Sequence, residues 1–126
     1  MNKINLSEKL SLFTDHWNPR IIGELNENYI KLAKLQGDFV WHSHRDEDEL
    51  FVVLKGKLLI DFKDDKNVSG VRTVAINPGE IIVVPKGVEH RPHGDEEVHI
   101  MLIEPKSVIN TGEVESELTR KELQQI

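Results

Sequence analysis

The 126-residue sequence predicts an all-β fold, a sandwich or a barrel built from short strands. Runs rich in β-branched and aromatic residues recur along the chain, and clusters of glycine, proline, asparagine and aspartate separate them. A chain of many short strands buries its sheet faces and protects its strand edges by closing into such a fold. We expect strands over Ile21–Leu25, Tyr29–Leu35, Phe39–His44, Glu49–Leu54, Lys57–Lys63, Val71–Ile76, Ile81–Val84 and Val98–Glu104.

Short helices are predicted at the two ends of the chain. Over residues 6–13 the apolar side chains fall on one helical stripe, with Asn5 as the cap and Glu8 three residues later. Near the C-terminus, Thr119 followed by Glu122 has the spacing of a capping box and predicts a short terminal helix. A frayed polar tail is the alternative there.

Length and composition narrow the class of protein. We expect one domain over residues 1–126, long enough to bury a core. The chain has no cysteine, so disulfides and thiolate metal sites are excluded. Its formal charge of −6 argues against nucleic-acid binding, because that field repels phosphate. No run has the apolar length of a signal peptide or a membrane span, so we expect a soluble cytoplasmic protein.

His42, His44, Glu49 and His90 are the candidate metal ligands. Two histidines one residue apart point to the same face of a strand, so a strand over Phe39–His44 presents both rings together. Several imidazoles with one carboxylate favour Fe, Mn, Ni, Co or Zn over Mg or Ca. Taken alone, the histidine pair is equally consistent with surface or hydrogen-bonded core residues.

Two segments resemble the paired motifs of the cupin superfamily. The first motif has a glycine, a His-x-His pair, a glutamate and a second glycine, here Gly37, His42, His44, Glu49 and Gly56. The second has a glycine, a Pro-x-Gly turn and a histidine, here Gly79, Pro85, Gly87 and His90. The first gap is one residue shorter than usual, and Gly94 stands where the second motif usually has asparagine.

The resemblance implies a double-stranded β-helix, or jelly-roll barrel, with its core over residues 21–105. It implies that His42, His44, Glu49 and His90 hold a divalent transition metal at the barrel mouth. It is closest to small cupins of unassigned activity named after mannose-6-phosphate isomerase. If the loop shifts, one of three acidic neighbours replaces Glu49 as ligand: Asp46, Glu47 or Asp48. Gly94 puts in doubt a structural hydrogen bond rather than a ligand.

Other residues near the motifs have competing interpretations. His93 is either a contact of the ligand shell or a solvent-exposed histidine, and His99 is expected to be packed or hydrogen-bonded. Trp41 points away from His42, which favours the core or a subunit interface. Phe51 and Val53 share the parity of Glu49 and line either the pocket or the core. The basic residues that could hold an anionic substrate, or be ordinary surface charges, are Arg45, Lys86 and Arg91.

The sequence supports a metal-dependent enzyme on a small metabolite, of dioxygenase or isomerase type, with a non-catalytic ligand-binding module as the alternative. An isomerase needs a base apart from the ligands, and the candidates are His93 and Glu80. A purely structural cupin does not need the four ligand types. The resemblance, together with the apolar outward residues Val52 and Leu54, also predicts a homodimer.

Overall fold

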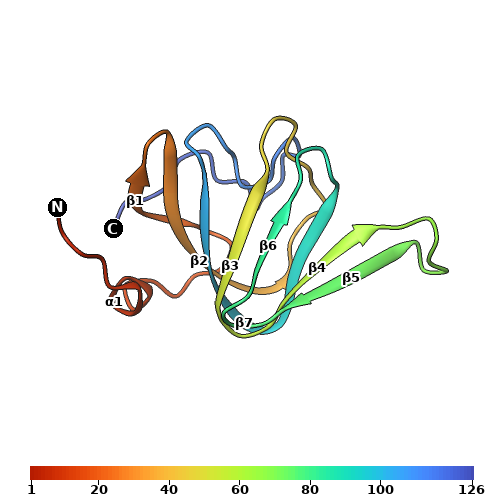
Figure 1. The fold of residues 1–126 in the computed structure, drawn as a ribbon, viewed down its shortest axis with the longest axis horizontal. Helices are drawn as coiled ribbons and strands as arrows, with labels where there is room; N and C mark the ends of the chain where they lie inside the picture. The colour runs from red at the N-terminus through yellow and green to blue at the C-terminus, as the bar shows by residue number, and fades with distance from the viewer.

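Seven antiparallel strands and one short helix make up the computed structural model, which describes residues 1–126 (Figure 1). The elements are α1 (Leu6–Leu10), β1 (Arg20–Leu25), β2 (Asn28–Asp38), β3 (Glu49–Lys55), β4 (Leu58–Lys63), β5 (Val71–Ile76), β6 (Ile81–Val84) and β7 (His90–Pro105). The predicted all-β jelly-roll class is confirmed. No helix of the structure has the length and apolarity that a membrane crossing requires.

Strand β7 joins the two halves of the sheet. Its second half lies between β2 and β3, where Ile100 pairs with Ala33 on one side and with Val53 on the other. Its first half pairs with β4, which carries the β4–β5 hairpin away from the body of the molecule (Figure 1). The sheet order is β1-β2-β7-β3-β6, with β4 and β5 branching from β7. One long strand shared by both halves lets the sheet curl around a common interior.

Side chains of one parity fill that interior. In β7 the buried residues alternate with half-buried ones, as expected of a strand with one face on the core. The main core consists of Trp17, Ala33, Leu35, Phe39, Phe51, Val53, Leu58, Ile60, Phe62, Ile76, Val84, Val98, Ile100 and Leu102. Trp17 stacks on Phe39 with ring centroids 4.7 Å apart. A smaller cluster of Phe13, Ile22 and Leu32 lies where α1 packs on the sheet.

The N-terminal helix forms where the sequence predicts it but is shorter. The Asn5 side chain accepts a hydrogen bond from the Glu8 amide at 2.9 Å, which is the expected cap. The helix ends at Leu10, and Phe13 is buried beyond it as part of the smaller cluster. The stripe over residues 6–13 is therefore an apolar surface of which only the first part is helical.

The predicted C-terminal helix is wrong. The Thr119 hydroxyl accepts from the Ser116 amide at 3.0 Å, so it closes a turn instead of capping a helix. The last residues then run beside β1, where the Ile21 amide donates to Gln124 and Ile126 donates back to Ile21. Backbone pairing with the edge of the sheet replaces the hydrogen bonds that a helix would make.

Candidate metal centre

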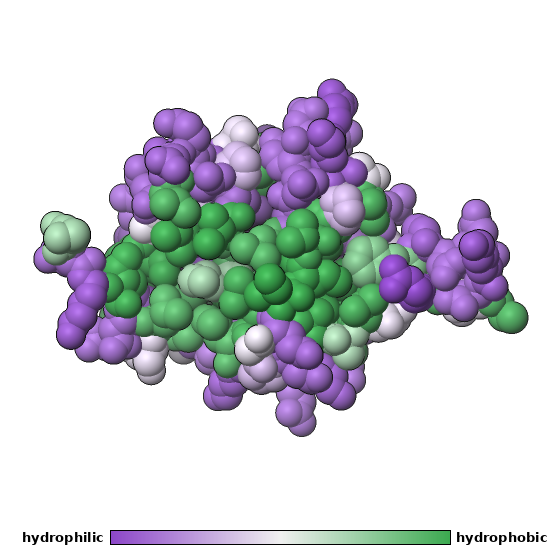
Figure 2. Space-filling model, in the orientation of Figure 1, coloured by the Kyte–Doolittle hydropathy of each residue, from purple (hydrophilic) through white to green (hydrophobic).

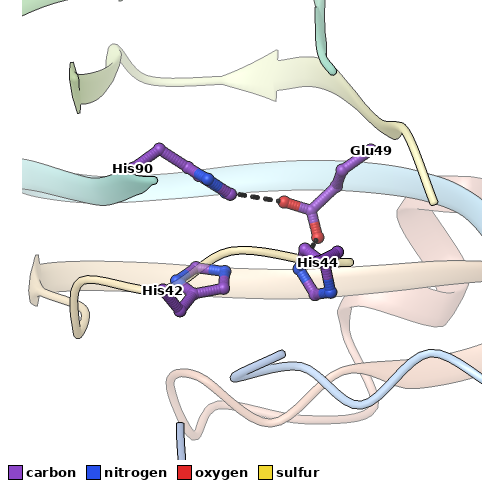
Figure 3. Close-up of side chains that lie close together, drawn as sticks. All are labelled: His42, His44, Glu49 and His90. Atoms are coloured by element: carbon purple, nitrogen blue, oxygen red, sulfur yellow. Dashed lines mark hydrogen bonds and ion pairs between the residues drawn. The ribbon is translucent and has the colours of Figure 1, made fainter. Parts of the chain in front are cut away.

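The four predicted ligands come from three parts of the chain. His42 and His44 lie on the segment between β2 and β3, Glu49 is the first residue of β3, and His90 is the first residue of β7. The structure brings all four side chains together at one end of the barrel interior (Figure 3). All are buried, with Glu49 6% exposed and His90 1% exposed.

The predicted strand over Phe39–His44 does not form. Strand β2 runs on to Asp38 with a bulge before Gly37, whose φ of +78° turns the chain, and the next segment crosses the barrel end. Its strand-like contacts are with the start of β7: the Phe39 amide donates to the Pro92 carbonyl at 2.9 Å, and His42 and His90 exchange backbone hydrogen bonds of 3.0 and 2.9 Å at an isolated bridge. Both rings still point inward, because extended backbone around this bridge keeps the alternation of side chains.

The Pro-x-Gly turn fixes the other side of this segment. The Gly87 amide donates to the His44 carbonyl at 2.7 Å, and the Lys86 amide donates to Asp48 Oδ1 at 2.9 Å. Hydrogen bonds from two backbone amides of the second motif therefore join it to the first.

The ligand atoms lie close enough for one ion. One ligand atom from each of the four side chains can be chosen so that all lie within 4.8 Å of one another. His44 Nε2 is 3.1 Å from Glu49 Oε2, and His90 Nε2 is 3.1 Å from Glu49 Oε1, so the carboxylate lies between two imidazoles (Figure 3). The rings of His42 and His90 are 4.3 Å apart between centroids.

Backbone carbonyls set the tautomer of two ligands. His42 Nδ1 lies 3.0 Å from the Val40 carbonyl, and His90 Nδ1 lies 2.9 Å from the Val88 carbonyl. Since a carbonyl oxygen only accepts, both Nδ1 atoms carry hydrogen and donate. This leaves Nε2 as the free ligand atom of each ring, the usual arrangement for metal-bound histidine.

The electrostatics of the cluster favour a cation. Burial and the neighbouring His90 lower the pKa of His42 to about 4, so its ring is neutral near pH 7 and keeps its lone pair. Burial alone would raise the pKa of Glu49, but the His44 and His90 rings beside it hold that pKa well below its usual range. Burial opposes protonation of His44, yet the Glu49 carboxylate outweighs it and raises the pKa of His44.

These donors fit a metal ion. In its neutral form His90 directs an Nε2 lone pair at a carboxylate oxygen, which is repulsive unless a proton or a cation lies between them. His44 Nε2 is buried without a hydrogen bond of good geometry to any group. Buried polar atoms are nearly always satisfied, so an unpaired nitrogen aimed at a carboxylate is typical of a ligand site.

A small cavity of about 40 Å³ opens beside the cluster. His42 and Glu49 contribute to its wall, and the remaining lining is mostly apolar: Trp17, Pro19, Ala33, Leu35, Phe39, Phe51, Pro92, Ile100, Leu102, Glu104 and Asn110. Phe51 thus lines the pocket as well as belonging to the core, whereas Val53 belongs to the core alone.

The three acidic neighbours of Glu49 lie outside the cluster. Asp46 and Asp48 are exposed, Glu47 is half-buried, and Asp48 accepts the Lys86 amide. The structure therefore places Glu49, at the start of its strand, as the carboxylate of the group.

The other histidines and basic residues pair elsewhere. His93 lies 2.9 Å from Asp61, which also binds Arg91, so the expectation that His93 is solvent-exposed is wrong. His99 is hydrogen-bonded to Glu97, as expected. Trp41 is half-buried beneath a cation, with Lys63 Nζ 3.9 Å from the centre of its ring. The two remaining basic candidates, Arg45 and Lys86, are exposed.

Sequence reasoning missed Lys31 and Glu104. Lys31 Nζ donates to Glu104 Oε1 at 3.1 Å, and the two side chains are 2% and 3% exposed. Burial and the nearby Glu49 carboxylate raise the pKa of Glu104 to about 7, against the effect of Lys31. Strand parity could have found Glu104, since it continues the inward series of Val98, Ile100 and Leu102.

Comparison with known proteins agrees with this geometry. The cupin domain family matches residues 29–104, which include both histidine motifs and the strands that carry them. This chain belongs to the cupin family. Among solved structures, a cupin-2 domain protein from Shewanella frigidimarina is 48% identical, with a TM-score of 0.76 over 82% of this chain and 94% of that one.

Other relatives of this cupin include one protein with an enzyme name. The Neisseria meningitidis protein NMB1881 is 33% identical, with a TM-score of 0.71 over 83% of this chain and all of that one. Acireductone dioxygenase 1 of Coprinopsis cinerea is 31% identical over 68% of this chain and 49% of its own length. Bacillus subtilis YdbB is 43% identical over 56% of this chain and 57% of its own. The chain thus spans about half the length of these two curated relatives.

Proposed function

We propose that this cupin binds one divalent transition metal through His42, His44, Glu49 and His90. The observation that carries the proposal is a buried group of four ligand atoms within 4.8 Å of one another, in which His44 Nε2 has no hydrogen-bond partner. Three imidazoles with one carboxylate suit Fe, Mn, Ni, Co or Zn.

The reaction we propose is oxygenation of a small organic ligand bound at the metal. Sequence similarity to acireductone dioxygenase 1 supports this class of reaction, and so does the apolar wall of the cavity. A bound Fe, Mn, Ni or Co ion would supply the means of bringing dioxygen and an organic ligand together. The resemblance to mannose-6-phosphate isomerase-like cupins raises isomerisation as a second possibility.

The protein itself positions the metal ligands and gives the cavity an apolar wall. The Val40 and Val88 carbonyls orient His42 and His90 so that each Nε2 faces the site. Aromatic and aliphatic side chains, Phe39 and Phe51 among them, form most of the cavity wall. Such a wall favours a small ligand that is apolar on one side.

Neither base that the sequence offered for an isomerase lies at the cavity. His93 is held by Asp61, and the exposed Glu80 side chain accepts the Asn77 amide at 2.7 Å. These two residues are therefore not placed to act as the base that isomerisation needs. The alternative is a module that binds a ligand without turnover, and the oxygen-uptake measurement below distinguishes that module from an enzyme.

Elemental analysis of protein purified without an affinity tag or added metal tests the site. We expect close to one transition-metal ion per chain in the wild type. In His42→Ala we expect the metal content per chain to fall at least about tenfold, because one imidazole ligand is removed. His16→Ala is the matched control, since His16 pairs with Glu97 away from the site. Undiminished metal in His42→Ala would overturn the assignment.

Oxygen-electrode measurements then test the reaction. Metal-loaded protein is offered catechols and enediols, and we expect oxygen uptake that is absent from His42→Ala. Metal binding with no uptake on any compound would favour the ligand-binding module instead.

A further inference from the structure

The cavity beside the ligand cluster has few polar side chains, and nearly all are already committed. Asn110 donates from Nδ2 to the Leu118 carbonyl at 2.9 Å and accepts the Arg120 amide at 2.8 Å. The Trp17 indole N–H donates to the Gln36 carbonyl at 3.0 Å. These groups hold the wall together and offer a ligand little beyond their apolar surfaces.

Glu104 is the exception among the lining residues. Its Oε1 accepts from Lys31, but its Oε2 is buried without any hydrogen-bond partner. A buried carboxylate oxygen that accepts nothing is costly, so such an atom usually faces a group that donates to it. Since Glu104 lines the cavity together with His42 and Glu49, the donor would come from whatever occupies the cavity.

The position of Glu104 is fixed on two sides. It continues the inward row of β7, and its charge partner Lys31 projects from the neighbouring strand β2, at the position that pairs with Leu102. The 3.1 Å contact from Lys31 Nζ orients the carboxylate so that one oxygen is used and the other is free. The free atom is therefore presented to the cavity in a defined direction.

Stability alone does not explain this ion pair. Two apolar side chains of similar volume fill a barrel interior without desolvating charges, and replacing buried ion pairs in this way is often neutral or stabilising. A pair needed only for packing also has no reason to leave one carboxylate oxygen unsatisfied.

We propose that Glu104 is a substrate-orienting residue, whose Oε2 accepts a hydrogen bond from a hydroxyl or N–H group adjacent to the metal-chelating oxygens of the ligand. The inference rests on the proposed metal site and narrows its ligands. It selects small chelators that carry a donor separate from their chelating oxygens, such as hydroxamic acids with an N–H group, over the same chelators with that donor methylated.

Two hydroxamic acids provide the probe. Acetohydroxamic acid and N-methylacetohydroxamic acid chelate a metal through the same two oxygens, but only the first carries an N–H donor. Calorimetric titration into Co(II)-loaded protein measures both dissociation constants. The reference is the ratio of the two dissociation constants for aqueous Co(II). Relative to that ratio, we expect the wild-type protein to bind acetohydroxamic acid at least about tenfold more tightly than the N-methyl compound, because hydrogen bonds to charged groups are strong.

Glu104→Gln reverses the polarity of the free atom while keeping its shape. Lys31 donates only, so it binds the amide oxygen, and the amide NH₂ then occupies the place of Oε2. We expect Co(II) to be retained and the preference for the N–H compound to disappear. The paired variant Lys31→Met/Glu104→Leu replaces the whole ion pair by apolar groups and should show the same loss if the single change impairs folding.

The outcomes separate the two proposals. A wild-type chain that does not hold Co(II) through His42 overturns the metal site and this inference with it. Two other outcomes overturn the inference while the metal site stands. In the first, the protein binds Co(II) tightly but shows the same ratio of affinities for the two hydroxamic acids as aqueous Co(II). In the second, the preference for the N–H compound is unchanged in both Glu104 variants.

Discussion

At the scale of single residues, backbone carbonyls orient two of the candidate ligand side chains. His42 and His90 each donate from Nδ1 to the carbonyl two residues earlier, at 3.0 and 2.9 Å. The same local device on two segments turns both Nε2 atoms toward Glu49. Because the orienting groups are main-chain carbonyls, substitutions at Val40 or Val88 that keep the backbone should leave the tautomers unchanged.

Asp61 illustrates a polar residue that stabilises the barrel without touching the ligands. Burial alone would raise the pKa of Asp61, but hydrogen bonds from Thr73, Arg91 and His93 outweigh it and lower the pKa to about 2. A carboxylate with a lowered folded-state pKa stabilises the fold above its ordinary value of 3.8, and this contribution is lost as the pH falls toward about 2.

We therefore predict that Asp61→Asn weakens the acid dependence of folding. Above the ordinary carboxylate pKa the variant should lose about 2 kcal/mol of unfolding free energy, and the deficit should shrink as the pH falls through this window. Urea unfolding of the variant and the wild type at a series of acidic pH values measures this difference in unfolding free energy. Asp65→Asn is the control, because the Asp65 side chain makes no hydrogen bond or ion pair. A deficit that is constant with pH would contradict the mechanism.

At the scale of elements, the sequence located most strands because turns and alternation leave local signals. Strands β1, β3, β5 and β6 lie within a residue of their predicted bounds. The segment over residues 39–44 has strand composition but pairs only with the start of β7. It continues along the β7 edge that β2 uses, through backbone hydrogen bonds of Phe39 with Pro92 and of His42 with His90. Long-range pairing of this kind has no signature in a local pattern.

The ligand group could be predicted because motifs carry its spacing. Strand parity points Glu104 inward, but its pairing with Lys31 could not be predicted. The two residues are 73 positions apart, and each reads as one charged residue in an apolar strand. Gly94 departs from the family pattern at the last position of the second motif. In the structure a side chain there would clash with Val98 and with the Glu96 carbonyl, so the glycine suits the local packing.

The C-terminal segment is an element in its own right, since it covers the residues around His44. Gly112 lies against the Ser43 backbone with φ of +59°, and the Glu113 amide donates to the Ser43 carbonyl at 3.3 Å. A Cβ at Gly112 would overlap the Ser43 carbonyl oxygen, and backbone on both sides of the contact has little freedom to move.

We predict that Gly112→Ala costs more unfolding free energy than Gly79→Ala. Both positions have positive φ, so both variants incur roughly 1–2 kcal/mol of left-handed strain, but a Cβ at Gly79 meets no atom within 4 Å. The overlap at Gly112 adds about 1–3 kcal/mol. Urea denaturation of the two variants compares them directly, and equal losses would show that the C-terminal segment is not held against Ser43.

At the scale of the whole molecule, the outer face of the sheet is apolar. Figure 2 shows hydrophobic residues gathered across the middle of the face that β2, β7, β3 and β6 form in Figure 1. Two rows cross the strands there by register, Val83–Leu50–Ile103 and Ile81–Val52–Met101. Ile81 and Val83 are 63% and 53% exposed. Helix α1 packs against the part of this face around Leu54 and leaves the remainder uncovered.

We propose that a second copy of the chain covers this face, as the predicted homodimer requires. The rows carry no charge, so two copies related by a two-fold axis can pack sheet on sheet without burying an unpaired ion.

Light scattering after size exclusion should give twice the chain mass of 14.5 kDa for wild type. Val83→Lys should give the single-chain mass, because the lysine would desolvate its ammonium in the interface. Val68→Lys is the matched control, since Val68 is fully exposed in the β4–β5 loop away from this face. A wild-type chain that elutes as a monomer at micromolar concentration, or a Val83→Lys variant that stays dimeric, would place the interface elsewhere or remove it.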